Sequence, residues 1–154
     1  MAYHVFIAGM ELPVTPSKIQ TKISNKNKTI TLINEGEVNL LKTPGLTEIT
    51  FDFMVPQVQY PFANPLQPAS YYLGQLEKLK VKKQKFQFIV SRVSPAGKSL
   101  FRTNMKVSLE EYTITEDAKE GLDLIITVKL KQYRDFGTKS VVVKEATANT
   151  AQTV

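Results

Sequence analysis

The segment 47–53 constrains the fold of this chain more than any other stretch. Its apolar residues Ile49, Phe51 and Phe53 alternate with polar residues, and a period of two is typical of a β-strand with one buried face and one wet face. The pair Pro44-Gly45 precedes this segment. It predicts a turn, because proline presets φ and glycine accepts positive φ.

The segment that follows the strand is rich in proline. Between Val55 and Pro68 they recur with Tyr60 and Phe62 among them, so a long loop without secondary structure of its own is expected. A loop of this length in a compact domain is usually functional or packed on a partner.

Most of the remaining chain also predicts strands. Glu35-Gly36 favours a hairpin between two half-buried strands at 29–34 and 37–41. Only the stretch from Ala69 to about Lys82 has apolar residues at spacings of three and four, which predicts one amphipathic helix. Further strands are expected at the short apolar segment 3–8 and at 18–24, 86–90, 100–115 and 122–133, and the last two are expected to form a long hairpin. The result is a mainly β, α+β chain, whose 154 residues fit one domain.

The reactive side chains argue against an enzyme. Cysteine is absent, His4 is the one histidine, and the seven glycines form no phosphate-binding motif, so we expect no catalytic residue, no cofactor and no metal. The acidic pairs Glu110-Glu111 and Glu116-Asp117 are interpreted as solvated surface. Adjacent residues in a strand point to opposite faces, and the second pair sits in a turn.

Nothing in the sequence predicts contact with a membrane. No apolar run approaches the roughly 20 residues of a membrane helix, and the N-terminus lacks the pattern of a signal peptide. We therefore expect the protein to be made in a cytoplasm and to stay there or be assembled there into something larger.

Three groups of residues are candidates for binding. The basic run has two interpretations, an exposed helix end or a contact for phosphate or an acidic neighbouring subunit. Tyr60 and Phe62 either fill the domain's own core or anchor a subunit interface, where aromatic residues are enriched. The basic run consists of Lys78, Lys80, Lys82, Lys83 and Lys85, and the predicted interface residues are Lys42, Thr43, Pro44, Gly45, Tyr60, Pro61 and Phe62.

The order of several motifs resembles a known family. The chain is similar to the N-terminal domain of tube-like, LysM-type baseplate hub proteins of contractile injection systems, which occur in myophage tails, PBSX-like prophages and R-type bacteriocins. The resemblance covers about residues 3–135 and lies in LPVTPSKI (Leu12–Ile19), EVNLLKTPGLTEITFDFMVP (Glu37–Pro56), YPF (Tyr60–Phe62), KFQFIV (Lys85–Val90) and LDLIITVKLKQYR (Leu122–Arg134).

The resemblance implies a tail-tube type of fold, an antiparallel β-sandwich or partial barrel with one flanking helix. It implies a tail-tube-like domain at 1–136 and a C-terminal extension or linker at 137–154, where family members commonly continue into LysM. In this sequence, residues 137–154 do not have the alternating helix and strand pattern of a LysM module. The resemblance therefore does not imply peptidoglycan binding.

The resemblance also implies a structural role in a virion or tail-like particle assembled in the bacterial cytoplasm. Copies of the chain would form a ring, preferably a hexamer, that connects the tail tube to the baseplate hub and spike, with DNA only as cargo in the lumen. The alternative is a monomeric β-barrel module that binds nucleic acid or another acidic polymer through Lys78–Lys85.

Overall fold

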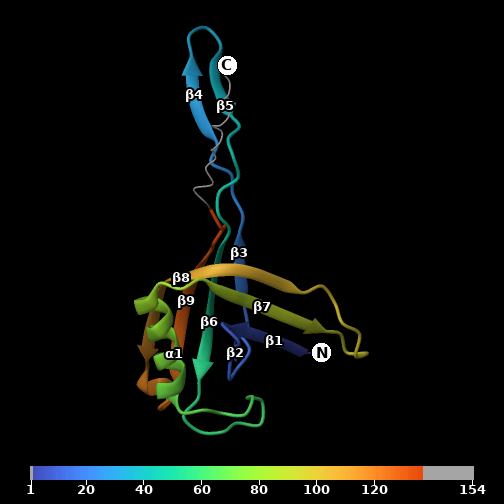
Figure 1. Cartoon of the computed structure of the whole chain (residues 1–154), viewed down its shortest axis with the longest axis vertical. Helices are drawn as coiled ribbons and strands as arrows, with labels where there is room; N and C mark the ends of the chain where they lie inside the picture. The colour runs from blue at the N-terminus through green and yellow to red at the C-terminus, as the bar shows by residue number, and fades with distance from the viewer. Residues whose placement is uncertain (1, 137–154) are drawn as a thin grey trace, which may run out of the picture.

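The computed structural model describes residues 2–136, which form a seven-stranded antiparallel sheet, a separate two-stranded hairpin and one α-helix (Figure 1). The strand order of the large sheet is β2-β1-β7-β8-β9-β6-β3. The elements are β1 (Ala2–Ile7), β2 (Met10–Glu11), β3 (Ile19–Lys22), β4 (Lys28–Leu32), β5 (Gly36–Leu40), β6 (Glu48–Val55), α1 (Ala69–Lys82), β7 (Phe86–Val93), β8 (Thr103–Glu116), the short 3₁₀ helix η1 (Ala118–Glu120) and β9 (Leu124–Gln132).

The core is built from alternate residues of the central strands. Ile49, Phe51 and Phe53 of β6 are buried, as the alternation predicts, and every second residue of β9 from Leu124 to Leu130 is buried beside them. Removing these apolar side chains from water is the main term that stabilises such a domain.

The sheet is strongly curved. The rings of Phe51 in β6 and Phe88 in β7 stack with centroids 5.6 Å apart, although β8 and β9 lie between these two strands. Three strand spacings in a flat sheet would amount to about 14 Å. The sheet therefore curls around its core, but its end strands β2 and β3 are not paired with each other. The mainly β, antiparallel class with one flanking helix is confirmed, and the sheet has the form of an open partial barrel.

The helix covers one side of this sheet. It runs over Ala69–Lys82 as predicted, begins after Pro68 and ends where Lys83 takes a left-handed conformation. Its buried side chains are Tyr72, Leu76 and Leu79, three of the apolar residues that recur at helical spacing.

One prediction about burial is wrong. Strands β4 and β5 do form a hairpin, and Gly36 takes the positive φ that its turn needs. However, the hairpin stands away from the body instead of packing on it (Figure 1), and no residue of β4 or β5 belongs to the buried core. A period of two predicts a strand but does not tell which surface will cover its apolar face.

Candidate assembly interface

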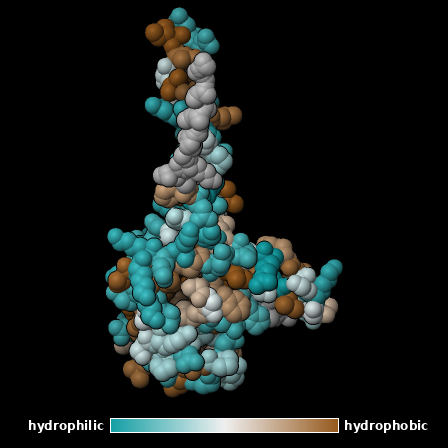
Figure 2. All heavy atoms as spheres, in the orientation of Figure 1, coloured by the Kyte–Doolittle hydropathy of each residue, from teal (hydrophilic) through white to brown (hydrophobic). Residues whose placement is uncertain are grey.

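The hairpin and its stem form an arm (residues 23–46) that projects along the longest axis of the molecule (Figure 1). The arm is apolar for a solvent-exposed element: Ile33 at its tip is 88% exposed, and Ile23 and Leu41 are also exposed. Apolar side chains gather at the far end of the arm in Figure 2. An isolated two-stranded hairpin is at best marginally stable in water, so this arm has the properties of a segment that another chain covers.

The predicted turn at Lys42–Gly45 is wrong, because these residues form the stem of the arm. Pro44 is bridged to Asn25, and the Gly45 amide donates to the Ser24 carbonyl at 2.8 Å. A Cβ on Gly45 would lie 3.0 Å from that oxygen, so this glycine permits a close backbone approach. A Pro-Gly pair is compatible both with a turn and with an extended strand that another strand approaches closely. Lys42, Thr43 and Pro44 are exposed, whereas Gly45 is buried.

The proline loop (residues 56–68) lies at the opposite end of the body and is fastened to Asp123 (Figure 1). The Asp123 carboxylate is buried and accepts from the Gln57 amide and from the Tyr60 hydroxyl, each at 2.9 Å. The hydrogen bond to Asp123 raises the pKa of Tyr60. Tyr60 is half-buried, while Phe62 stacks on its ring at 5.1 Å and remains 65% exposed. Tyr60 thus fits the interpretation that it packs within its own domain, whereas the exposed Phe62 fits the interpretation as an interface residue.

Gln59 organises the inside of the same loop. Its side-chain amide donates to the carbonyls of Tyr60, Ala63 and Asn64 at 3.1–3.2 Å and accepts from the Leu66 amide at 2.9 Å. These four hydrogen bonds replace backbone pairs that a loop lacks. Neither Gln59 nor Asp123 was predicted from the sequence, because a single glutamine or aspartate carries no periodic signal.

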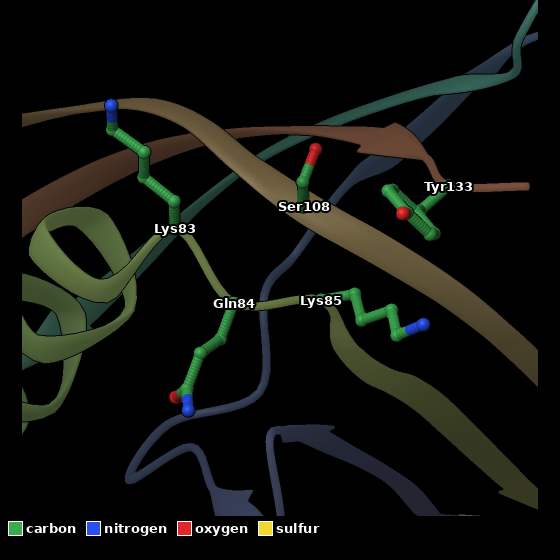
Figure 3. Close-up of a pocket in the computed structure, with 5 residues that line it drawn as sticks. All are labelled: Lys83, Gln84, Lys85, Ser108 and Tyr133. Carbon is green, nitrogen blue, oxygen red and sulfur yellow. The ribbon is translucent and has the colours of Figure 1, made fainter. Parts of the chain in front are cut away.

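The basic run lies at the end of the body from which the arm leaves. Lys83, Gln84 and Lys85 line an open pocket of about 620 Å³ together with Ser108 and Tyr133 (Figure 3). The Lys85 ammonium lies 5.0 Å from the centre of the Tyr133 ring, a contact across the sheet that the sequence did not reveal. We call these five residues the basic pocket.

Two lysines of the run have partners within the domain. Lys80 lies 3.4 Å from Glu77, and Lys85 lies 2.7 Å from Asp135. All five lysines of the run are exposed, so the interpretation as a solvated helix end agrees with their positions. Within residues 2–136, Lys78, Lys82 and Lys83 form no ion pair.

The ion pairs of Asp135 can be tested through the pH dependence of stability. Hydrogen bonds from Lys106 and from Lys85 lower the pKa of this carboxyl from its ordinary value of 3.8 to about 2. Because the folded pKa is the lower one, the stabilisation is present above the ordinary pKa and is lost as pH falls through the folded pKa. We expect Asp135→Asn to lower the melting temperature at neutral pH, and the difference from the parent to shrink between about pH 4 and pH 2.

Circular dichroism melts across this pH range measure the effect. The matched control is Asp52→Asn, since Asp52 is also exposed and forms no ion pair within residues 2–136. A difference between Asp135→Asn and the parent that is the same at pH 2 as at neutral pH would contradict the assigned pairing.

The described residues offer little to a catalytic or metal site. His4 is bonded to Glu11 at 2.7 Å, and Glu11 also accepts from the Asn64 side chain at 3.1 Å, so this group ties the proline loop to β2. Within residues 2–136 no three His, Asp or Glu side chains come together as a metal site requires. The same part of the chain has no helix that is long and apolar enough to span a membrane.

These observations describe a mainly β domain that exposes apolar groups at both ends of its long axis. The two predicted interface groups are not brought together, because Lys42–Gly45 lie in the arm and Tyr60–Phe62 lie at the other end (Figure 1). The two groups therefore belong to separate surfaces of one copy.

Comparison with solved structures shows that this fold occurs in contractile injection systems. A chain of the tube-terminating cap of the anti-feeding prophage superposes with a TM-score of 0.55 and 13% identity, over 86% of this chain and 84% of that one. A chain of the sheath-tube complex of the extracellular contractile injection system PVC gives 0.54 and 14%, over 86% and 84%. A chain of the six-fold symmetrised baseplate of the anti-feeding prophage gives 0.51 and 11%, over 89% and 92%.

Sequence comparison finds a relative of higher identity. The uncharacterized protein YqbP of Bacillus subtilis (strain 168) is 24% identical over 140 residues, which are 90% of this chain. The chain spans about 60% of the length of that relative. No protein-family model matches the chain.

Proposed function

We propose that this chain is a structural subunit of a contractile phage tail or tail-like particle. In this role it acts by assembly and not by catalysis, and its copies form a ring, preferably a hexamer, that connects the tail tube to the baseplate hub and spike. The observation that carries the proposal is the arm, an exposed apolar hairpin that does not pack on the body formed by the rest of residues 2–136.

The geometry supports ring formation in a second way. The arm and the proline loop are different surfaces at opposite ends of the body, so a contact from the arm of one copy to the proline loop of a copy in the same orientation would be heterologous. Heterologous contacts generate closed rings or open stacks. Within residues 2–136 the outer edges of β2 and β3 are unpaired, so they offer further backbone donors and acceptors to neighbouring chains.

The solved structures that share the fold belong to a tube cap, a sheath-tube complex and a baseplate. The LysM-type hub identity, the connecting position in the particle, assembly in the cytoplasm and DNA as cargo in the lumen remain parts of the proposal. The domain division at 1–136 is also a proposal, since residues 137–154 lie outside the described part of the chain.

The alternative, a monomeric module for an acidic polymer, has weaker support. Glu77 and Asp135 already compensate two of the five lysines that it requires. A polymer-binding groove gains affinity by placing unpaired cations along a backbone.

Assembly of the purified chain tests the proposal. We expect sedimentation velocity over a rising concentration series to show a defined oligomer, and negative-stain electron microscopy to show rings or stacked rings. A monodisperse monomer at every concentration would count against a ring-forming subunit. Salt-sensitive binding of that monomer to nucleic acid would favour the alternative.

A further inference from the structure

We propose that the acidic turn between β8 and β9 of one copy docks into the basic pocket of a second copy. This inference rests on the proposed function and names the contact by which copies would join end to end. It also assigns a role to the basic run, which assembly through the arm does not explain.

The basic pocket has the charge and shape for a projecting acidic segment. Lys83 and Lys85 extend on either side of Ser108 in Figure 3, and the Tyr133 ring closes the side next to Lys85. The nearby cations Lys78 and Lys82, which form no ion pair within residues 2–136, add to the positive field. No acidic residue lines the pocket itself, but two carboxylates contact its lining: Glu110 accepts from the Ser108 hydroxyl at 2.9 Å, and Asp135 pairs with Lys85 at 2.7 Å. Lys83 is the lining cation that forms no ion pair within residues 2–136.

The acidic turn (residues 116–120) is the complementary element. Its sequence, EDAKE, has three acids and one lysine, and the Glu116 and Asp117 side chains are exposed. Asp117 accepts from the Lys119 amide at 2.9 Å, so the turn has a defined conformation. Beyond it, Leu122 is 81% exposed and adds apolar surface at the same end of the body.

The two elements lie at opposite ends of one side of the body. Helix α1 runs along this side from the proline loop to the basic pocket, and the β8–β9 hairpin lies next to it (Figure 1). The acidic turn lies at the same end of the body as the proline loop. Asp123, which follows the turn, is hydrogen-bonded to Gln57 and Tyr60 of that loop. A second copy placed in the same orientation on top of the first therefore brings its acidic turn towards the pocket.

The domain itself contains an example of the same recognition chemistry. The Asp135 carboxylate is held between the ammonium groups of Lys85 and Lys106 next to Tyr133. A carboxylate from another copy would meet Lys82 and Lys83, which form no ion pair within residues 2–136. The arm leaves the body at the same end (Figure 1), so one docked copy would contact both the pocket and the arm.

Charge reversal tests the contact through a mixing experiment. The pocket variant is Lys82→Glu with Lys83→Glu, and the turn variant is Glu116→Lys with Asp117→Asn, which keeps the acceptor at position 117. Each variant alone should need about tenfold or more higher concentration to assemble, because like charges then face each other. An equimolar mixture should assemble like the parent, because each reversed surface then meets an opposite one. Lys98→Glu with Arg102→Glu, two exposed residues of the β7–β8 connection, changes the net charge by as much as the pocket variant does and is the matched control.

An engineered disulfide provides a second measurement that does not depend on charge. The chain has no cysteine, so Ser108→Cys combined with Glu116→Cys is a clean background. Mild oxidation of assembled protein should give a ladder of covalently linked copies, whereas Lys98→Cys with Glu116→Cys should not. Absence of the ladder from assembled protein would overturn the proposed contact.

The outcomes separate this inference from the proposed function. If the parent assembles and both charge variants assemble equally well, the proposed contact is wrong but the ring-forming function still stands. Failure of the parent itself to assemble overturns both. If the parent binds duplex DNA and the pocket variant does not, while both assemble normally, the pocket binds nucleic acid and the proposed contact between copies is wrong.

Discussion

A chain whose arm is replaced by a short turn is expected to fold normally and to lose assembly entirely. Asn25 and Pro44 face each other as bridge partners, so a two-residue Asn-Gly turn can replace residues 26–43. No buried core residue lies in the removed segment. The melting temperature should therefore stay within a few degrees of the parent, whereas sedimentation velocity should show only monomer.

A variant with two polar substitutions, one at the tip and one at the base of the hairpin, is the matched control for this deletion. Ile33→Ser with Leu41→Ser keeps the hairpin ladder and its length but removes two exposed apolar groups. If apolar burial of the arm drives assembly, this variant should assemble only at higher concentration than the parent. Rings formed by the armless chain at the parent's concentration would show that the arm is not the assembly element.

The second large effect is expected in the core at Phe51. Its side chain is 2% exposed and packs against both Phe88 and Phe53. Phe51→Ala removes these contacts and leaves a cavity in a tightly curved sheet, which should lower the free energy of unfolding by about 3–5 kcal/mol. Urea denaturation followed by circular dichroism measures this change.

Phe136→Ala is the control for the same truncation at the surface. Phe136 is 83% exposed, so its truncation should change the free energy of unfolding by no more than about 0.5 kcal/mol. Equal effects of the two substitutions would mean that Phe51 does not lie at the centre of the core. In contrast to the arm replacement, Phe51→Ala should impair assembly only to the extent that the domain unfolds.

Local patterns predicted most of the elements. The alternation around Phe51 predicted β6, the spacing of Tyr72, Leu76 and Leu79 predicted α1, and Glu35-Gly36 predicted the hairpin of the arm. Each pattern depends on a repeat of two or about 3.6 residues. Such repeats report which side chains share a face, and the structure confirms those faces for β6 and α1.

The candidate interface was predicted less completely. The exposed residues Lys42, Thr43, Pro44, Pro61 and Phe62 were named from sequence, but Gly45 proved to be buried and Tyr60 to be bonded to Asp123. Gln59, Asp123 and Tyr133 were missed. Each of them acts through a partner that chain folding brings close and that no local spacing indicates.

The strands, the helix, the arm hairpin and the lack of obvious catalytic groups could all be predicted from residue type and short-range periodicity. Three features depend on how the chain folds in space and could not be predicted: β4 and β5 leave the body, the lysines after α1 border a pocket next to Tyr133, and this pocket and the acidic turn lie at opposite ends. They could not be predicted because a periodic pattern specifies which face of a strand or helix is apolar but not what covers it. Curling of the seven-stranded sheet around Phe51 and Phe88 fills the core without β4 and β5, and the rest of residues 2–136 does not cover the exposed apolar side chains of the arm.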